Sequence, residues 1–296
     1  MSEFLLELYS EEIPPQLQIN ARTQLKQLIE KSFEEKGIHY KACLEYSSPT
    51  RLSIYIKGLP EKIKVKAKEV KGPKVGVTEN ILQGFTKSHN VSENKLFKKE
   101  IDKGEFYFIK APEKNLLVED LLIDILPKTI SAISWKKSMK WSTNSLMWGR
   151  PLRSIFALFN GKRLPFKYQH LNSTDNIIIE QDLLTSSQKI KSFKEYFLFL
   201  KKNNIILDQN ERKKIILKRF NAISKSKNYK EKYNQHLLEE VVNIVENPNV
   251  LLINFDKEYL KIPQEIIIST LEKHQRYFPI FDSREKLTNY FFVVAN

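Results

Sequence analysis

The sequence predicts an α+β fold, with mixed sheets and packed amphipathic helices in the N-terminal part, mainly helical structure after about residue 185, and a short strand pair at the end. Segments of period two alternate with segments of helical period through the first 170 residues, and the helical period dominates from Gln188 onward. The 41% hydrophobic and 28% charged residues are typical of a globular protein. We therefore expect an α+β domain over residues 1–185, which can consist of two lobes, and a mainly helical region with C-terminal strands over residues 186–296.

A strand and a long helix are expected first. Residues 4–9 have strand composition, and Pro14 and Pro15 then start a helix. Apolar residues at helical spacing give this helix one buried face: Leu17, Ala21, Leu25, Leu28, Ile29 and Phe33. Gly37 supplies the C-terminal stop. Residues 43–56 then indicate two strands that are interrupted at residues 47–50.

Strands and helices continue to alternate over residues 62–133. Residues 62–68 alternate apolar side chains with four lysines, which predicts a half-exposed strand with a basic outer face. These lysines either form a binding surface or protect an edge strand against aggregation. A turn at residues 103–105 precedes a strand over residues 106–110. Helices are predicted over residues 80–89 and 116–133, the second with a kink at Pro127.

Helices dominate the last third of the chain. Asp208 and Glu211 have capping-box spacing and open a helix with an apolar inner face. Its outer face is expected to be basic: Arg212, Lys213, Lys214, Lys218 and Arg219. This stripe is either a solvated helix face or a contact surface for nucleic acid. Further helices are expected over residues 236–246 and 263–271, with strands over residues 250–255, 277–281 and 290–295.

The charge balance points to a polyanionic partner. Lys and Arg total 49 against 35 Asp and Glu, a formal net charge of +14. Such a surface attracts RNA or DNA, although a codon bias towards lysine would produce the same excess. No apolar stretch reaches the length of a membrane span, and acidic residues stand where a signal peptide carries positive charge. We therefore expect a cytoplasmic protein without membrane contact.

Sequence motifs for catalysis are missing. Neither GxGxxG nor GxxxxGK[ST] occurs among only 8 glycines, and the five histidines form no metal-binding pair. Cys43, the only cysteine, is interpreted as a small buried hydrophobe. Glu11 and Glu12 are either paired acids at a site or acids that complement a helix dipole. No catalytic residue, metal site or cofactor site is therefore predicted on this chain.

Several short strings in order resemble one known family. Residues 7–15, ELYSEEIPP, are similar to the EIGTEELPP opening of the β subunit of bacterial heterotetrameric glycyl-tRNA synthetase, and residues 48–52, SPTRL, resemble its TPRRL string. Matches to further strings follow in the family's order: KGP at residues 71–73, GF at 84–85, KGE at 103–105, KSMKW at 137–141, RPL at 150–152, LLEEV at 237–241 and HQRYF at 274–278.

Three departures accompany the resemblance. Ser142 replaces the glycine of the family's MRWG string, and the loss of glycine changes the backbone conformations that the turn there can adopt. A GHRF string expected near residues 178–184 is absent. The chain also ends at Asn296, where the family continues with an HD-type helical domain and an anticodon-binding domain, so the sequence corresponds to the family's N-terminal half.

The resemblance implies an α2β2 ligase that joins glycine to tRNA-Gly with ATP and Mg²⁺. The α subunit of such an enzyme carries the active site, and the β subunit binds tRNA and supports assembly. We accordingly expect an inactive isolated chain. Alternatives are a free-standing RNA-binding or scaffold protein and a non-functional truncation. Cations and an aromatic residue are the candidates for tRNA contact: Arg51, Lys140, Trp141, Arg150, Arg153, Arg212, Lys213, Lys218 and Arg276.

The candidate cations next to aromatic residues allow two interpretations. They are Lys140 beside Trp141, Arg150 beside Trp148, and Arg276 beside Tyr277 and Phe278. Either the pair contacts phosphates and stacked bases, or the aromatic ring belongs to the core while the cation reaches the surface.

Overall fold

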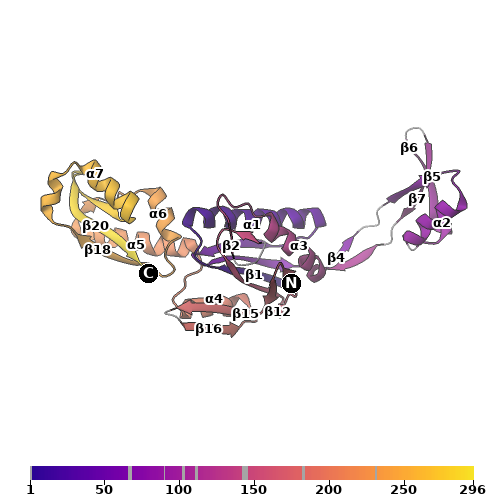
Figure 1. Ribbon diagram of the computed structural model, residues 1–296, viewed down its shortest axis with the longest axis horizontal. Helices are drawn as coiled ribbons and strands as arrows, with labels where there is room; N and C mark the ends of the chain where they lie inside the picture. Colours follow the sequence, from indigo (N-terminus) through magenta and orange to yellow (C-terminus); the bar gives the residue numbers. More distant parts are fainter. Residues whose placement is uncertain are drawn as a thin grey trace. The chain divides into compact units, whose positions relative to one another are not determined.

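The computed structural model describes residues 2–65, 69–89, 91–101, 104–110, 113–141, 146–181, 184–230 and 232–296. The chain forms two compact units (Figure 1). The first unit contains Met1–Leu59 together with Leu122–Asn296, and the second contains Pro60–Leu121. The α+β fold is confirmed, while the domain boundary near residue 185 stays a prediction.

A seven-stranded sheet forms the centre of the first unit. Its order is β13-β14-β11-β1-β3-β2, with β12 paired to β11. The central strand β1 is antiparallel to both β3 and β11, and nearly all of its residues are buried. The strands span β1 (Ser2–Ser10), β2 (Ala42–Ser48), β3 (Arg51–Leu59), β11 (Leu152–Phe159), β12 (Lys162–Arg163), β13 (Lys167–Tyr168) and β14 (Leu171–Thr174).

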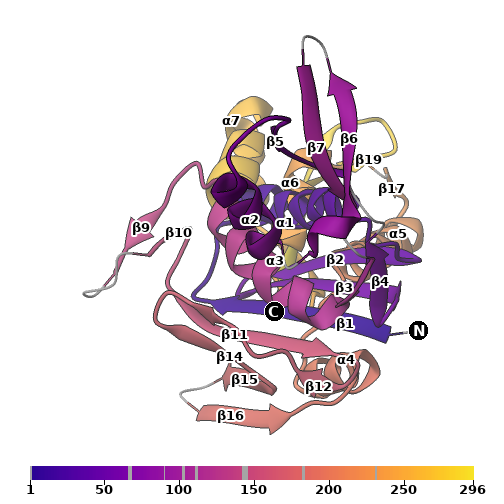
Figure 2. The same cartoon turned by 90° about the vertical axis from the view of Figure 1, so that its right-hand side faces the viewer.

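Two helices cover one face of this sheet. α1 (Pro15–Lys36) and α3 (Val118–Ala132) lie on the same side (Figures 1 and 2). The predicted apolar face of α1 is confirmed, since its buried residues are Leu17, Gln18, Ala21, Leu25, Ile29 and Phe33. Gly37 ends α1 with a φ of 68°, a left-handed conformation that glycine adopts without steric cost.

The opposite face of the sheet carries a hairpin and a helix. The hairpin consists of β15 (Asn176–Gln181) and β16 (Leu184–Lys189), and the helix is α4 (Phe193–Lys202). Their apolar side chains form one core with the sheet: Leu5, Tyr55, Phe156, Leu158, Ile177, Ile179, Ile190, Tyr196, Leu200, Ile205 and Leu207. A separate two-stranded ribbon joins β9 (Met139–Lys140) to β10 (Met147–Trp148).

The C-terminal part of this unit packs helices on a four-stranded sheet of order β17-β19-β20-β18. The expected final strand pair is confirmed as β19 and β20, and β17 and β18 extend it. Ile216, Phe220 and Leu238 pack against Phe278 and Phe292 of the sheet. The elements are α5 (Gln209–Lys227), β17 (Tyr229–Lys230), α6 (Gln235–Val242), β18 (Asn249–Asn254), η2 (Lys257–Lys261), α7 (Gln264–Ser269), η3 (Thr270–Gln275), β19 (Phe278–Asp282) and β20 (Leu287–Ala295).

The second unit contains a two-stranded ribbon and a three-stranded sheet of order β5-β7-β6 (Figure 2). Helix α2 packs closely on this sheet, since a Cβ atom at Gly72 would lie 2.6 Å from the Phe85 ring. The elements are β4 (Lys62–Val65), β5 (Glu69–Lys74), α2 (Glu79–Ser88), η1 (Glu93–Lys95), β6 (Leu96–Ile101), β7 (Gly104–Lys110) and β8 (Lys114–Leu117).

Two boundaries in this region differ from the prediction or lie outside the described residues. The helix predicted from residue 116 begins at Val118, because Leu116 and Leu117 pair with Ile63 and Lys62 in the ribbon. The predicted strand over residues 62–68 is confirmed for Lys62–Val65, and residues 66–68 lie outside the described residues. Three further positions of the sequence analysis also lie outside the described residues. They are Lys103 in the predicted turn, Ser142, and residues 182–183 in the segment that replaces GHRF.

Candidate functional site

Three of the strings that carry the family resemblance meet at one end of the central sheet. The Ser10 amide donates a hydrogen bond to the Thr50 carbonyl at 2.9 Å, and the Ile13 amide donates to the Pro49 carbonyl at 2.7 Å. The Glu11 amide donates to the Pro151 carbonyl at 3.0 Å. Residues 7–15, 48–52 and 150–152 thus form one continuous structure, although they are far apart in sequence.

A buried charge pair lies beneath this junction. Arg51 Nη1 is 2.9 Å from Glu7 Oε2, and both side chains are nearly inaccessible to solvent. The Tyr196 hydroxyl of α4 donates to the same Glu7 oxygen at 2.6 Å, and Ser53 Oγ lies 2.8 Å from that hydroxyl. Because each charge has a partner, the pair ties β1, β3 and α4 together without leaving an uncompensated buried ion.

Arg51 also contacts the β15–β16 hairpin and the Tyr9 ring. Arg51 Nη2 donates to the Ile178 carbonyl at 2.6 Å, and its guanidinium lies 4.6 Å from the centre of the Tyr9 ring. The Tyr9 hydroxyl donates to Glu180 Oε2 at 3.1 Å, and Arg153 Nη1 lies 2.5 Å from that oxygen. These contacts attach the β15–β16 hairpin to the end of the central sheet.

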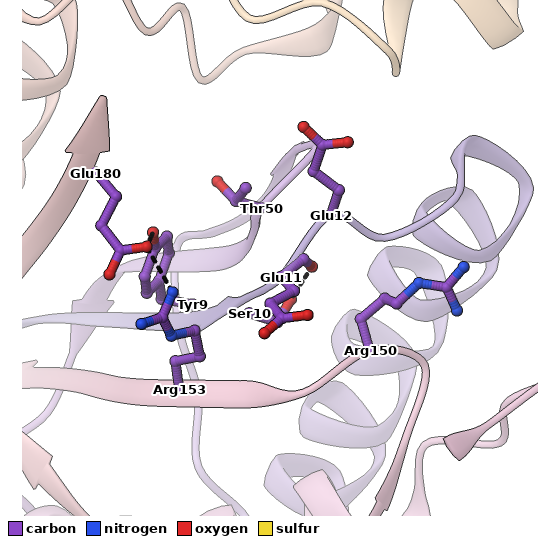
Figure 3. Close-up of a pocket in the computed structure, with 8 residues that line it drawn as sticks. All are labelled: Tyr9, Ser10, Glu11, Glu12, Thr50, Arg150, Arg153 and Glu180. Atoms are coloured by element: carbon purple, nitrogen blue, oxygen red, sulfur yellow. Dashed lines mark hydrogen bonds and ion pairs between the residues drawn. The ribbon is translucent and has the colours of Figure 1, made fainter. Parts of the chain in front are cut away.

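A pocket of about 510 Å³ opens above this arrangement (Figure 3). Tyr9, Glu180 and Arg153 lie together on one side of it, while Arg150 lies on the other (Figure 3). Among the described residues, no ion pair joins Arg150, Glu11 or Glu12 to another side chain. The full lining is Tyr9, Ser10, Glu11, Glu12, Thr50, Arg150, Arg153 and Glu180.

A second pocket of about 410 Å³ shares four of these lining residues. It adds Glu246, whose carboxylate accepts a hydrogen bond from Ser48 Oγ at 2.6 Å. The Glu246 and Asn247 amides both donate to Asn296 Oδ1, at 2.7 Å and 3.1 Å. The two pockets together hold more carboxylates than cations, which favours cationic or polar groups over phosphate as occupants.

The hydroxyl and thiol groups nearest this region are protonated at neutral pH. Burial raises the pKa of Tyr9 to about 12, with the Arg51 charge opposing and the Glu180 charge adding to the shift. Burial likewise raises the pKa of the Cys43 thiol to about 12, and the thiol lies within the sheet rather than in the pocket. No group of three or more His, Cys, Asp or Glu side chains positioned to hold a metal ion occurs among the described residues. The pocket is therefore equipped to bind polar groups, and neither of these side chains is a nucleophile there.

The structure brings three of the predicted contact residues to this region. Arg150 and Arg153 line the first pocket, and Arg51 lies at the wall of the second. Arg51 is only 1% exposed, so its charge is committed to Glu7 rather than presented at the surface. Arg153 is exposed and already paired with Glu180.

The other predicted contact residues lie elsewhere in the first unit. Lys140 is exposed at the end of β9, and the Trp141 ring meets the His170 ring edge-on at 6.4 Å. On α5, Lys218 is exposed, and Lys213 Nζ lies 3.9 Å from Glu239 Oε1. Arg276 has a positive φ of 59°, and its Nε donates to Glu240 Oε1 at 2.8 Å, which joins the HQRYF and LLEEV strings.

The prediction that Arg212 lies on the outer face of its helix is wrong. Its side chain is fully buried, and its guanidinium donates to four backbone carbonyls. The acceptors are Val242 at 2.9 Å, Ile206 at 2.6 Å, Leu207 at 3.0 Å and Ser47 at 2.8 Å. Arg212 is at the first turn of α5, where these carbonyls surround it, so it joins α5 to the end of β2 and to α6.

The aromatic neighbours of two candidate cations belong to the core. Trp148 is 1% exposed and its ring lies 4.8 Å from the Trp135 ring. Phe278 is 1% exposed and packs in the C-terminal cluster. For Arg150 and Arg276, the interpretation with the ring in the core and the cation outside it therefore fits the structure.

The sequence did not reveal the pocket residues Tyr9 and Glu180, which are separated by 171 positions. Glu11 and Glu12 precede the helix cap at Pro14 rather than standing in the first turn of α1, and both are exposed at the pocket. In the sequence, Pro14 and Pro15 mark the start of the helix after these two glutamates. This was the available signal that the glutamates lie outside the helix.

Comparison with known proteins decides the family. The family model described as glycyl-tRNA synthetase beta subunit matches residues 4–296. The chain belongs to this family. It is 35% identical to the glycine–tRNA ligase beta subunit of Rickettsia felis over 298 aligned residues, covering 100% of this chain and 45% of that protein. The corresponding subunits of Rickettsia peacockii and Rickettsia canadensis are each 36% identical, with 44% of their length covered.

The family match concerns the N-terminal part of its members. The chain spans about 45% of the length of the curated relatives that it matches. The strings that meet at the pocket, and the pair joined by Arg276 and Glu240, all lie within the matched residues. Among the described helices, none is long and apolar enough to cross a membrane.

Proposed function

We propose that this chain serves as the β-subunit part of glycine–tRNA ligase that holds tRNA-Gly and assembles with the catalytic α subunit in the cytoplasm. The observation that carries the proposal is membership of the glycyl-tRNA synthetase β-subunit family across residues 4–296. The net charge of +14 supports an RNA partner, since each phosphate that a cation neutralises releases condensed counterions.

The proposal assigns no chemical step to this chain. ATP with Mg²⁺ would bind to the α subunit, where glycine is activated. The pocket above Arg51 supports a binding role, because its carboxylates would repel triphosphate and the Tyr9 hydroxyl stays protonated and bonded to Glu180 instead of acting as a base. We expect no glycine-dependent pyrophosphate exchange by the purified chain alone. Exchange in a preparation shown to be free of α subunit would refute this assignment.

Three charged side chains of the pocket, which have no ion-pair partner in the part of the chain that the structure describes, are suited to a protein partner. Arg150, Glu11 and Glu12 offer both signs of charge within one recess, which matches the mixed side chains of a protein surface better than a run of phosphates. We propose that the α subunit contacts this recess. Arg150→Glu should then weaken association with the α subunit, whereas Lys162→Glu, a change at an exposed cation on β12 that has no ion-pair partner among the described residues, should leave it unchanged.

Association with the purified α subunit is the experiment that separates the proposal from its alternatives. Mass photometry of the mixture should show a complex that contains both chains. A free-standing RNA-binding protein would bind tRNA but would form no complex with the α subunit. A non-functional truncation would bind neither. Either result would overturn the assembly role.

A further inference from the structure

The three-stranded sheet of the second unit presents a face of lysine and phenylalanine side chains. Residues paired across antiparallel strands share a face, and alternate residues within a strand lie on opposite faces. The strand register pairs Lys99 with Phe106 and Phe97 with Phe108 between β6 and β7, and Lys71 with Phe108 between β5 and β7. The lysine–phenylalanine face therefore consists of Glu69, Lys71, Lys74, Phe97, Lys99, Ile101, Gly104, Phe106, Phe108 and Lys110.

Cations and rings interleave on this face. Lys71 Nζ lies 3.7 Å from the centre of the Phe106 ring, and Lys99 Nζ lies 5.9 Å from that of Phe108. The Phe97 and Phe108 rings are 5.8 Å apart. All four lysines are exposed, and Phe97 and Phe106 are partly exposed, so ammonium groups and ring surface are both available to a ligand.

The two faces of the sheet differ in charge. The lysine–phenylalanine face has four lysines and the single carboxylate Glu69, a net charge of +3. The opposite face has Lys98 against Glu100 and Glu105, a net charge of −1. Each face also carries one buried side chain, Phe108 on the lysine–phenylalanine face and Ile109 on the opposite face. A polyanion would therefore distinguish the faces by charge, although their strands are the same.

We infer that the lysine–phenylalanine face binds unpaired RNA, with bases stacked on the Phe97 and Phe106 rings and phosphates held by the surrounding lysines. A sheet surface with exposed rings and adjacent cations suits single-stranded RNA, whose unstacked bases offer a π-face and whose backbone offers a charge at each step. A duplex hides its bases and gives the rings nothing to stack on. The inference deepens the proposed function and rests on it for tRNA as the source of the unpaired segment.

Fluorescence anisotropy of the whole chain with a labelled oligouridine of about 12 nucleotides tests this, since oligouridine forms no stable duplex. Phe106→Leu keeps an apolar side chain and removes the ring, and should weaken binding about tenfold. The matched control Tyr107→Leu changes the neighbouring ring on the opposite face and should have little effect. Denaturant unfolding of both variants checks that the unit remains folded.

The charges provide a second, independent comparison. Lys99→Gln should weaken binding and reduce the log–log salt slope by about 0.7, the value for one phosphate of a single strand. Lys98→Gln, one residue away on the other face, should leave the slope unchanged. Glu69→Gln should tighten binding, because it removes the carboxylate that lies 2.9 Å from Lys99 Nζ.

Three results would overturn the inference. Oligouridine affinity could be unchanged in Phe106→Leu, or Lys98→Gln could be as harmful as Lys99→Gln. Inorganic polyphosphate could also lose as much affinity as oligouridine in Phe106→Leu, which would show attraction without stacking. The proposed function can be judged separately from this inference. It stands if the unchanged chain binds tRNA and the α subunit, even when Phe106→Leu leaves the affinity for oligouridine unchanged. The proposed function alone is refuted if Phe106→Leu weakens oligouridine binding but the unchanged chain binds neither tRNA nor the α subunit.

Discussion

Glu7 and Arg51 form an ion pair of 2.9 Å at positions that are almost completely buried, where the central strand β1 meets its neighbour β3. Arg51 also contacts the ring of Tyr9, which lines the pocket where the ELYSEEIPP, SPTRL and RPL strings meet. This charge pair links the ELYSEEIPP string to the SPTRL string, and further hydrogen bonds connect its two partners to α4 and to the β15–β16 hairpin.

Arg51→Met is expected to lower the free energy of unfolding by about 3–5 kcal/mol, because it leaves the Glu7 carboxylate buried without its counter-charge. Lys26→Met is the matched control, since Lys26 and Glu45 are also 2.9 Å apart but remain about 30% exposed. That exposed pair should contribute less than about 1 kcal/mol. Urea unfolding of both variants makes the comparison, and equal losses would contradict the role given to the buried pair.

Arg212→Met should also destabilise the first unit, by about 3 kcal/mol or more, because four carbonyl acceptors lose a charged donor. Lys218→Met on the same helix should change the free energy of unfolding by at most about 0.5 kcal/mol, since that side chain is exposed. Thermal unfolding of both variants would show the difference. Similar small losses for both variants would mean that the Arg212 contacts are dispensable.

Local sequence patterns predict some of these features and miss others. Helix α1 was predictable because its stop glycine and its apolar spacing are local features. The burial of Arg212 was not, since its acceptors come from the preceding loop, from α6 and from β2. Glu180 was missed for the same reason, because only the folded chain brings it to Tyr9.

The lysine–phenylalanine face could likewise be predicted only in part, because it depends on how three strands pair in a sheet. The strand over residues 106–110 was predicted, and alternation of Phe106, Phe108 and Lys110 was visible in it. The register that places Lys71 and Lys99 beside those rings depends on pairing between three strands. A bulge between Lys71 and Lys74 adds to this, and neither feature has a local sequence signal.

Alkaline pH should reveal the buried thiol. Burial raises the pKa of Cys43 to about 12, with the Glu30 carboxylate adding to the shift. A group whose folded-state pKa is raised stabilises the fold below its unfolded pKa and loses that contribution as pH rises towards the folded value. Between pH values of about 8 and 10, the chain should therefore lose about 1 kcal/mol more than Cys43→Ala. Urea unfolding at both pH values measures the free energy of unfolding of the two proteins. An equal loss of free energy in both would contradict the raised pKa of the Cys43 thiol.

The proposal that this chain holds tRNA-Gly can be tested through the salt dependence of tRNA-Gly binding by the purified chain. If the chain holds tRNA through its excess of cations, affinity should fall with salt at a log–log slope of about −0.7 to −0.9 per phosphate contacted. Substitution of Lys214, Lys218 and Arg219 together by Gln should reduce that slope only if the exposed face of α5 contacts the RNA. A filter-binding titration should give a steep negative slope for the unchanged chain. An affinity independent of salt, or no binding at low salt, would contradict the role in holding tRNA.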